Sequence, residues 1–282
     1  MKNKPKSENR FGGVAIAQHP LFIIRQGRKN MKYTAQYQIS WHDTDANRRL
    51  RPSQLLVYMQ ETANLQLKDS GVSLDELRDA RGLAFLLSRI TVRMYEPLYA
   101  YDRIDVQTWV CEGHGLRFDR CFCVLRDGKV VAEAYSAWAL MNLNEKRLMR
   151  ANEFSYNFPP DEAMSGELTA RVRYPALAQM ELAGERRIVY SDIDYNGHMN
   201  NTHYPDMLCD FTDGILQKKV VGMSLSFLHE GTFGHTLKVY RQVSEDGCYF
   251  RTVDEDGTSC LEAVLLTEED ASLKSEQDEE NT

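Results

Sequence analysis

The spacing of apolar residues predicts two amphipathic helices in this chain. In residues 53–68 the apolar positions recur about every 3.6 residues, and the same spacing returns in residues 202–218. The first set is Leu55, Leu56, Met59, Ala63 and Leu67, and the second is Met207, Leu208, Phe211 and Ile215. Each helix therefore has one face to bury against another element.

Behind each helix the pattern changes to extended runs rich in β-branched and aromatic residues, bounded by turn signals such as "RDGK" at 126–129. The predicted strands are 83–97, 103–112, 116–126 and 129–143 in the first half, and 220–230, 236–244, 247–254 and 258–267 in the second. Each half reads as strand, helix and four strands. A lone helix beside such a meander buries its stripe on the sheet, which predicts an α+β fold of tandem hotdog type.

An internal repeat supports the two copies. Residues 41–50 ("WHDTDANRRL") align without a gap on residues 190–199 ("YSDIDYNGHM") at an offset of 149, and aromatic, Asp, Asp, Asn and aliphatic positions coincide. The predicted organisation is a loose N-terminal extension (1–30), a first hotdog (31–150), a linker (151–182), a second hotdog (183–267) and a disordered acidic tail (268–282).

Composition narrows the classes of function. The net charge of the 282 residues is −7, and seven acidic residues against one lysine place −6 of it in the tail, so binding of nucleic acid is not expected. No run of 18 uncharged apolar residues occurs, so stable membrane insertion is not expected either. The six cysteines have no metal-finger spacing and fit buried thiols in a reducing cytoplasm.

Polar side chains are concentrated at 190–201 ("YSDIDYNGHMNN"). If the chain is extended there, Asp194, Asn196 and His198 point to one side, just before a helix whose free amide groups suit a developing oxyanion. Asn200 or Asn201 is expected to cap that helix.

A glutamate ends the strand after each helix, Glu96 in "RMYEPLY" and Glu230 in "FLHEGTF". Glu96 and Glu230 are interpreted as equivalent positions of the two copies, and this recurrence indicates a functional role. Glu230 is therefore expected to face Asn196 and His198 between helix and sheet.

These residues carry a resemblance to the acyl-acyl carrier protein (acyl-ACP) thioesterase family. The duplication, the D-x-N-x-H string at 194–198, its "HMNNTHY" continuation and the later Glu230 all match over about residues 33–267. The resemblance implies a tandem hotdog in which the first copy (31–150) shapes the acyl pocket and the second copy (183–267) holds the catalytic residues. Its implied reaction is hydrolysis of acyl-ACP to a free fatty acid, ending fatty acid synthesis. Its implied partner is a carrier protein bearing an acyl-phosphopantetheine.

Two features depart from the plant members of that family. Their residue after the catalytic glutamate is commonly cysteine, whereas Gly231 stands here, and their long plastid-targeting segment has no counterpart. The sequence is therefore expected to be a bacterial-type enzyme without a thiol nucleophile at that place.

Glu230 and His198 are predicted to activate water, Asn196 to position that water or polarise the carbonyl, and Asp194 to orient its neighbours. A first attack by a carboxylate stays open. Arg49 stands where the second copy has His198, and because a guanidinium does not exchange protons near neutral pH, the first copy is expected to be inactive.

The basic run "NRRLR" at 47–51 has two interpretations, a solvated charge run or a contact for phosphopantetheine phosphate or an acidic carrier. His203 and His229 are expected to be structural, and His235 is placed at a turn. No metal, nucleotide or other cofactor is predicted, and G-x-S-x-G is absent.

Alternative functions are a hotdog acyl-CoA thioesterase and a non-catalytic acyl-binding hotdog protein, with an enoyl-thioester hydratase less favoured. Acyl length and a homodimer are left open.

Overall fold

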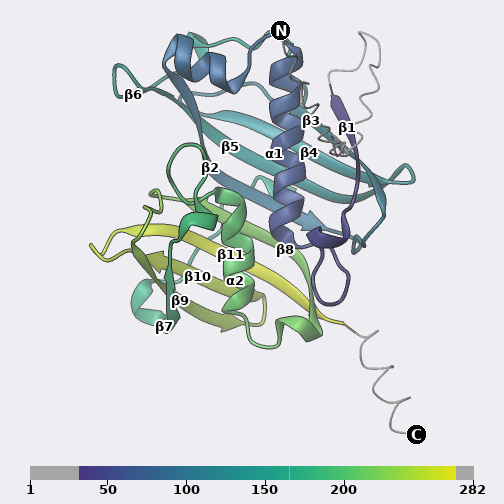
Figure 1. Cartoon of the computed structure of the whole chain (residues 1–282), viewed down its shortest axis with the longest axis vertical. Coiled ribbons are helices and arrows are strands. Elements are labelled where there is room, and N and C mark those ends of the chain that lie inside the picture. Colours follow the sequence, from purple (N-terminus) through teal and green to yellow (C-terminus); the bar gives the residue numbers. More distant parts are fainter. Residues whose placement is uncertain (1–31, 165, 271–282) are drawn as a thin grey trace, which may run out of the picture.

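Two helices lie against one face of a single antiparallel sheet in the computed structural model, which describes residues 32–164 and 166–270 (Figure 1). The long helix α1 covers Pro52–Asp69 and the short helix α2 covers Tyr204–Asp210. Pro52 begins α1, where its fixed φ and missing N–H are harmless. The predicted apolar stripe of α1 is 0–6% exposed, so this prediction is confirmed.

The strands of the two halves repeat one arrangement. The first half contains β1 (Tyr33–Gln38), β2 (Leu83–Met94), β3 (Arg103–Val110), β4 (Phe118–Arg126), β5 (Lys129–Asn142) and the short β6 (Arg147–Leu148). The second contains β7 (Glu181–Arg187), β8 (Lys218–Phe227), β9 (Thr236–Ser244), β10 (Gly247–Val253) and β11 (Ser259–Glu269). All eight predicted strands are present, and the tandem hotdog fold is confirmed.

The sheet joins the copies through their second strands. Its order is β1-β3-β4-β5-β2-β8-β11-β10-β9-β7, so each copy has the same internal order. β2 and β8 pair antiparallel, with Arg89 opposite Ser226 and Arg93 opposite Gly222. β8 therefore runs toward one end of this ladder and β2 toward the other. A single apolar core contains buried residues of both copies.

Short helical turns connect these elements. They are η1 (Trp41–Asp43), the π-helical η2 (Glu76–Ala80), η3 (Ala151–Glu153), η4 (Gly166–Leu168), η5 (Leu177–Gln179), η6 (Tyr190–Asp192), η7 (Asn201–His203) and η8 (Ile215–Gln217). η1 and η6 occupy equivalent places before the two polar turns, while η2 and η8 follow the two helices.

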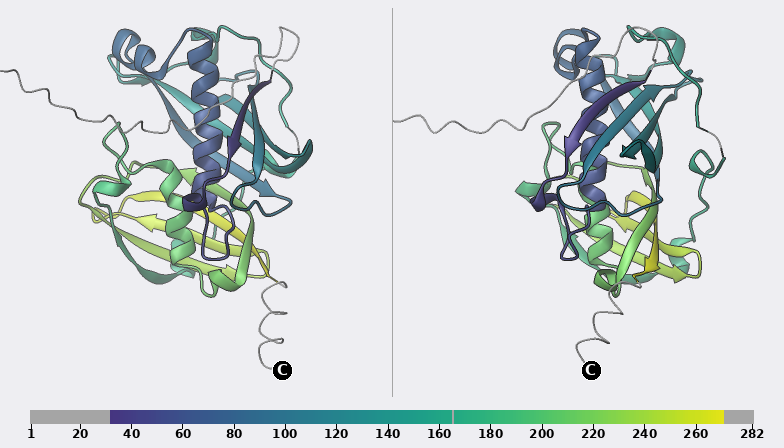
Figure 2. Two further views of the ribbon diagram at one scale, coloured as in Figure 1. Left: turned by 45° about the vertical axis from the view of Figure 1, so that its right-hand side comes forward. Right: turned by 90° about the vertical axis from the view of Figure 1, so that its right-hand side faces the viewer.

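The connection between the copies crosses the sheet on the face opposite the helices (Figure 2). Side chains on that face hold it: Arg89 donates to the carbonyls of Thr169 and Ala170, and Arg251 donates to the carbonyl of Pro175. β7 begins at Glu181, two residues before the start expected for the second copy.

Two sequence-based expectations are wrong. The helix expected over 202–218 spans only Tyr204–Asp210 and leaves the helical conformation at its C-cap Phe211 (φ −103°, ψ 16°), and after the left-handed Gly214 (φ 65°) the chain continues as the separate turn η8. The acidic tail was expected to be disordered from residue 268, yet Glu268 and Glu269 end β11 opposite Lys219 and Lys218. The extension 1–30 and residues 271–282 lie outside the described residues.

The cysteines are all free, and five of the six are buried as expected, with Cys209 half-buried. Among the described residues, no helix has the length and apolar character needed to cross a bilayer.

Candidate active site

The residues Asp194, Asn196 and His198 come together in a tight turn between η6 and η7. The amide of Asp194 donates to the carbonyl of His198 (3.0 Å), and the amide of Gly197 donates to the carbonyl of Asp194 (3.0 Å). Gly197 has φ 85°, a conformation that glycine adopts easily. The expectation of an extended chain here is wrong, and it is the turn that gathers these residues.

Asp194 organises the turn through both carboxylate oxygens. Its Oδ1 accepts from the amide of Asn196 (2.8 Å) and its Oδ2 accepts from the side-chain Nδ2 of Asn196 (3.2 Å). These bonds fix the Asn196 side chain against Asp194, as the expected orienting contact requires.

Glu230 approaches the turn from the segment after β8. Oε2 of Glu230 lies 3.0 Å from Nε2 of His198. Two backbone contacts maintain this register, an antiparallel bridge between His198 and Thr232 and a 2.8 Å bond from the amide of Met199 to the carbonyl of Gly231. The side chains are 37% (His198) and 59% (Glu230) exposed, so water can reach both.

Arg78 is a member of this site that sequence reasoning missed. It belongs to η2 in the first copy, and its Nη1 donates to Oδ1 of Asn196 across 118 residues of sequence. Its guanidinium carbon also lies 5.5 Å from the centre of the Tyr195 ring, within cation–π distance. No motif surrounds Arg78, and only the joining of the copies through β2 and β8 brings it here.

The first copy builds the same turn without an imidazole. Oδ1 of Asp45 accepts from the amides of Asn47 (2.8 Å) and Arg49 (2.9 Å), and Arg48 has φ 63° where Gly197 stands in the second copy. Arg49 is 6% exposed. Its guanidinium bonds Asp45 (3.2 Å) and Asp270 (3.0 Å), so the interpretation of 47–51 as a solvated run is wrong for Arg49.

The expected equivalence of Glu96 and Glu230 is wrong by one residue. The amide of Leu50 donates to the carbonyl of Leu98 (2.7 Å) as that of Met199 donates to Gly231, which places Pro97 at the position of Glu230. Glu96 instead bonds Lys129 and Arg126 (2.7 Å to the latter), and these cations lower its pKa. The first copy therefore lacks both the imidazole and the carboxylate.

Gly231 sits where a side chain has little room. A Cβ at this position would lie 2.8 Å from Cδ1 of Ile188, 2.8 Å from Oη of Tyr204 and 3.1 Å from Cβ of Met199. The close packing excludes even a methyl group without movement of these neighbours.

The remaining polar residues of the stretch have structural contacts. Oδ1 of Asn200 accepts from the amide of Thr202 (3.0 Å), so the expected cap is confirmed, and that amide is not free for an oxyanion. Oδ1 of Asp192 accepts a hydrogen bond from Nη2 of Arg186 (2.6 Å) and lies 3.6 Å from Nδ1 of His203. Burial alone raises the pKa of Asp192, but the Val189 amide, Arg186 and His203 together hold it below its usual range.

One group within the described residues has ligand atoms close enough to hold a cation. His235, Asp254 and Asp256 place one such atom each within 4.8 Å of one another. Oδ1 of Asp254 already accepts from the amides of Asp256 and Thr258, which is an ordinary turn arrangement. Sequence spacing did not find the group because His235 comes from a different segment.

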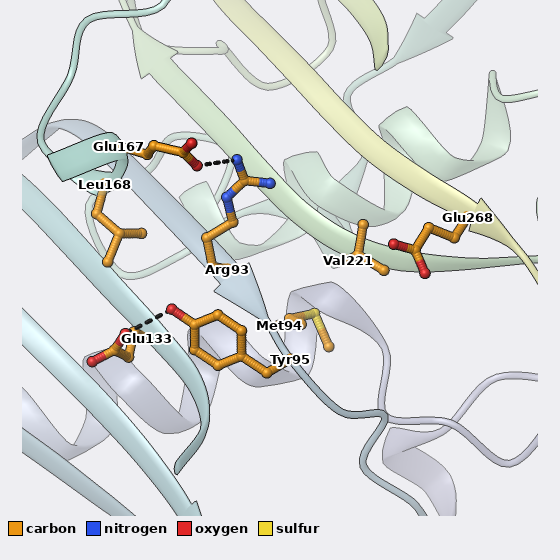
Figure 3. Close-up of a pocket in the computed structure, with 8 residues that line it drawn as sticks. All are labelled: Arg93, Met94, Tyr95, Glu133, Glu167, Leu168, Val221 and Glu268. Atoms are coloured by element: carbon orange, nitrogen blue, oxygen red, sulfur yellow. Dashed lines mark hydrogen bonds and ion pairs between the residues drawn. The ribbon is translucent and has the colours of Figure 1, made fainter. Parts of the chain in front are cut away.

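A surface hollow among the described residues lies away from the catalytic turn. It has a volume of about 450 Å³ and lies beside the pairing of β2 with β8, with Arg93 and Val221 among its lining residues (Figure 3). Its charged groups are paired, Arg93 with Glu167 (2.6 Å) and the Tyr95 hydroxyl with Glu133 (2.7 Å). It presents no histidine and no free nucleophile for hydrolysis.

Comparison with known proteins agrees with the geometry. Residues 30–156 match the acyl-ACP thioesterase N-terminal domain, and residues 179–275 match the acyl-ACP thioesterase C-terminal domain. Oleoyl-acyl carrier protein thioesterase 2 of Arabidopsis thaliana is 25% identical over 222 residues, which are 70% of this chain. That match covers 59% of the relative, so the chain spans about six-tenths of its length.

Solved structures share the whole architecture. An acyl-ACP thioesterase from Bacteroides thetaiotaomicron superposes with a TM-score of 0.77 at 25% identity, covering 86% of this chain and 100% of the other. The 12:0-ACP thioesterase from Umbellularia californica has the same fold, with a TM-score of 0.75 at 18% identity and coverage of 87% and 100%. Since the two domain models match in order over residues 30–156 and 179–275, and the second match contains the His198–Glu230 pair, the chain belongs to the acyl-ACP thioesterase family.

Proposed function

We propose that this chain hydrolyses acyl-ACP to a free fatty acid and the carrier protein, the step that ends fatty acid synthesis. The observation that carries the proposal is the 3.0 Å approach of Nε2 of His198 to Oε2 of Glu230 beside an ordered asparagine. The names of the Arabidopsis and Cuphea relatives, oleoyl- and palmitoyl-acyl carrier protein thioesterases, support a carrier-bound acyl thioester as the substrate class.

Water activation is assigned to the His198–Glu230 pair. The thioester carbonyl has little resonance stabilisation and its thiolate leaves readily, so the main tasks are activating water and holding the oxyanion. The water oxygen bonds to the carbonyl carbon while its proton passes to the pair. The tetrahedral intermediate then breaks its C–S bond, and the pantetheine sulfur receives that proton.

Asn196 is assigned to the oxyanion. Its Oδ1 accepts from Arg78 and one Nδ2 hydrogen is donated to Asp194. One Nδ2 hydrogen is left to donate to the carbonyl oxygen. Asp194 and Arg78 thus position the amide from the two copies of one chain, and the proposed site needs no second chain.

A covalent route uses Glu230 as the attacking group, with water releasing the acyl chain afterwards. The covalent route forms a mixed anhydride and releases the carrier thiol before the fatty acid, so rapid-quench single turnover separates the routes. Thiol release that precedes fatty acid release, with an acyl adduct on Glu230 by mass spectrometry, supports the covalent route. In ¹⁸O-labelled water, label in the carboxylate of Glu230 also supports it, whereas label only in the fatty acid fits either route, because water can open the anhydride at its acyl carbon. Thiol and fatty acid released together with no adduct fit direct attack by water.

A panel of carrier-bound and CoA-bound acyl chains of equal length tests the substrate class. The proposal predicts that kcat/KM is about tenfold or more higher for the carrier thioester at the preferred length, because the carrier surface adds contacts and steering that CoA lacks. Equal values for the two thioesters would favour an acyl-CoA thioesterase. No hydrolysis of either would favour an acyl-binding protein.

The free cysteines support placing this reaction in a reducing compartment, and we assign it to the cytoplasm.

A further inference from the structure

A second cavity lies at the inactive turn of the first copy. Its volume is about 240 Å³, and it lies between the turn at 45–49, the end of β2 and the segment from α2 to β8. Its walls are mostly apolar and include Leu50, Met94, Leu98, Cys209, Ile215 and Val220. This volume is slightly below the range of about 300–1,000 Å³ for drug-sized ligands, so the cavity suits one unbranched chain.

The cavity occupies the place that the catalytic site has in the second copy. Nδ2 of Asn47 donates to the carbonyl of Leu216 in η8 (2.7 Å), as Asn196 contacts Arg78 in η2. Each polar turn therefore meets the segment that follows the other copy's helix. Because Arg49 and Pro97 replace the imidazole and the carboxylate, a ligand here would be held without hydrolysis.

The two sites are separate. The β8 strand ends near Arg89 of β2 and leads to Glu230, whereas β2 ends near Gly222 of β8 and leads to Pro97. The cavity thus lies at the opposite end of the β2–β8 ladder from His198. An acyl chain bound in the catalytic site would therefore not fill this cavity.

One charged donor of the cavity has no acceptor, although Asp45, Asp206 and Asp210 are among the lining residues. Nε of Arg51 is buried and has no hydrogen-bond acceptor, although Nη2 of the same guanidinium donates to the carbonyl of His42 (2.9 Å). Lys218 and Lys219 also line the cavity. Oδ2 of Asp206 accepts from the hydroxyl of Ser53 (2.7 Å) and lies 3.8 Å from Nη1 of Arg51, so this aspartate pairs with Nη1 and leaves Nε without an acceptor. An unsatisfied buried donor of a charged group is unfavourable, and a carboxylate would satisfy it.

We propose that this cavity is a non-catalytic binding site for a free medium-chain fatty acid, with the alkyl chain on the apolar wall and the carboxylate on Nε of Arg51. The site does not depend on whether the catalytic turn hydrolyses acyl-ACP. It gives the chain a second place to bind a molecule of the same class as its proposed product.

Methyl NMR of the whole chain tests the proposal with two internal reporters. The δ1 methyl of Ile215 reports on the cavity, and the δ1 methyl of Ile188, adjacent to Gly231, reports on the catalytic site. Decanoate is titrated below its micelle concentration, with decanol as the neutral probe. The expected result is a saturable shift of Ile215 with decanoate and at least a fivefold weaker effect with decanol.

Two arginine variants give the matched comparison. Arg51→Leu is expected to weaken the decanoate response of Ile215 about tenfold, because it removes the charged donor. Arg48→Leu, an exposed neighbour outside the cavity, is expected to leave it unchanged. A shift of Ile188 alone would overturn the proposal, as would an Ile215 response that is equal for decanoate and decanol. The wild-type comparison decides even if Arg51→Leu does not fold.

Discussion

Nε2 of His198 lies 3.0 Å from Oε2 of Glu230, although the two residues belong to separate segments joined by α2 and β8. The backbone bridge of His198 to Thr232 holds them in register. Both first-copy counterparts are changed, to Arg49 and Pro97. The structure thus contains one complete pair and one degenerate turn on the same scaffold.

Arg78→Ala should lower kcat about tenfold with little change in KM, because Oδ1 of Asn196 loses the donor that positions its amide. Arg78→Lys should restore part of the rate. Steady-state hydrolysis of acyl-ACP provides the measurement. Arg81→Ala is the control, since Arg81 follows the same turn but pairs with Glu76. Equal losses in the Arg78 and Arg81 variants would contradict the positioning role.

Gly231→Cys should destabilise the fold by about 1–3 kcal/mol without raising the rate, because its Cβ would lie 2.8 Å from both Ile188 and Tyr204. Urea unfolding followed by circular dichroism measures the change. Thr232→Cys introduces the same thiol at an exposed neighbour and should have little effect. A faster Gly231→Cys enzyme would show that a thiol here can take part in the reaction.

Arg49→His should not restore activity to a His198→Ala enzyme, since Pro97 supplies no carboxylate beside the new imidazole. It should also destabilise the fold by about 2–4 kcal/mol, because Asp45 and Asp270 lose a buried cation. Hydrolysis by the double variant and thermal unfolding of Arg49→His measure the two effects. Recovery of activity would mean that the first copy retains a working site.

Asp192→Asn should lower stability near pH 7 by about 2 kcal/mol, through loss of the charge-assisted bond to Arg186. Because the folded pKa of Asp192 lies below its unfolded value of about 3.9, its contribution is present above that value and disappears as the pH falls through the folded pKa. The difference between wild type and variant should therefore shrink as the pH falls from 6 to 3.

Thermal unfolding across that pH range checks this prediction. Asp213→Asn is the matched control, since Asp213 also pairs with an arginine but is 81% exposed and screened by solvent. A difference that grows toward low pH would contradict the assignment.

Most of the fold was predictable because its signals are local. The apolar stripe of α1, the strand alternation and the turn residues act over a few neighbours, and the predicted strands appear within a few residues of their expected ends. The helix expected over 202–218 was wrong because the apolar spacing continued through Phe211 and Ile215, whereas the backbone leaves the helix at Phe211 and turns again at the left-handed Gly214.

The site was less predictable because register and domain contact decide it. Glu96 was matched to Glu230 by strand position, and only the ladder bonds of Leu50 and Met199 show that Pro97 is the counterpart. Arg78 contacts Asn196 because β2 and β8 join the two copies in one sheet, and no sequence pattern around Arg78 predicts that contact. Asp270 looked like part of a charged tail, yet it bonds a buried arginine.

A pair of glutamate variants tests the central assignment most directly. Glu230→Gln keeps the shape of the side chain but removes the carboxylate beside His198, and Glu96→Gln makes the same change in the first copy, where the glutamate pairs with Arg126 and Lys129. The measurement is kcat for acyl-ACP with both variants confirmed as folded. The predicted result is a loss of about 10²–10⁴ for Glu230→Gln and near wild-type turnover for Glu96→Gln. Near wild-type turnover by Glu230→Gln would contradict the proposed site.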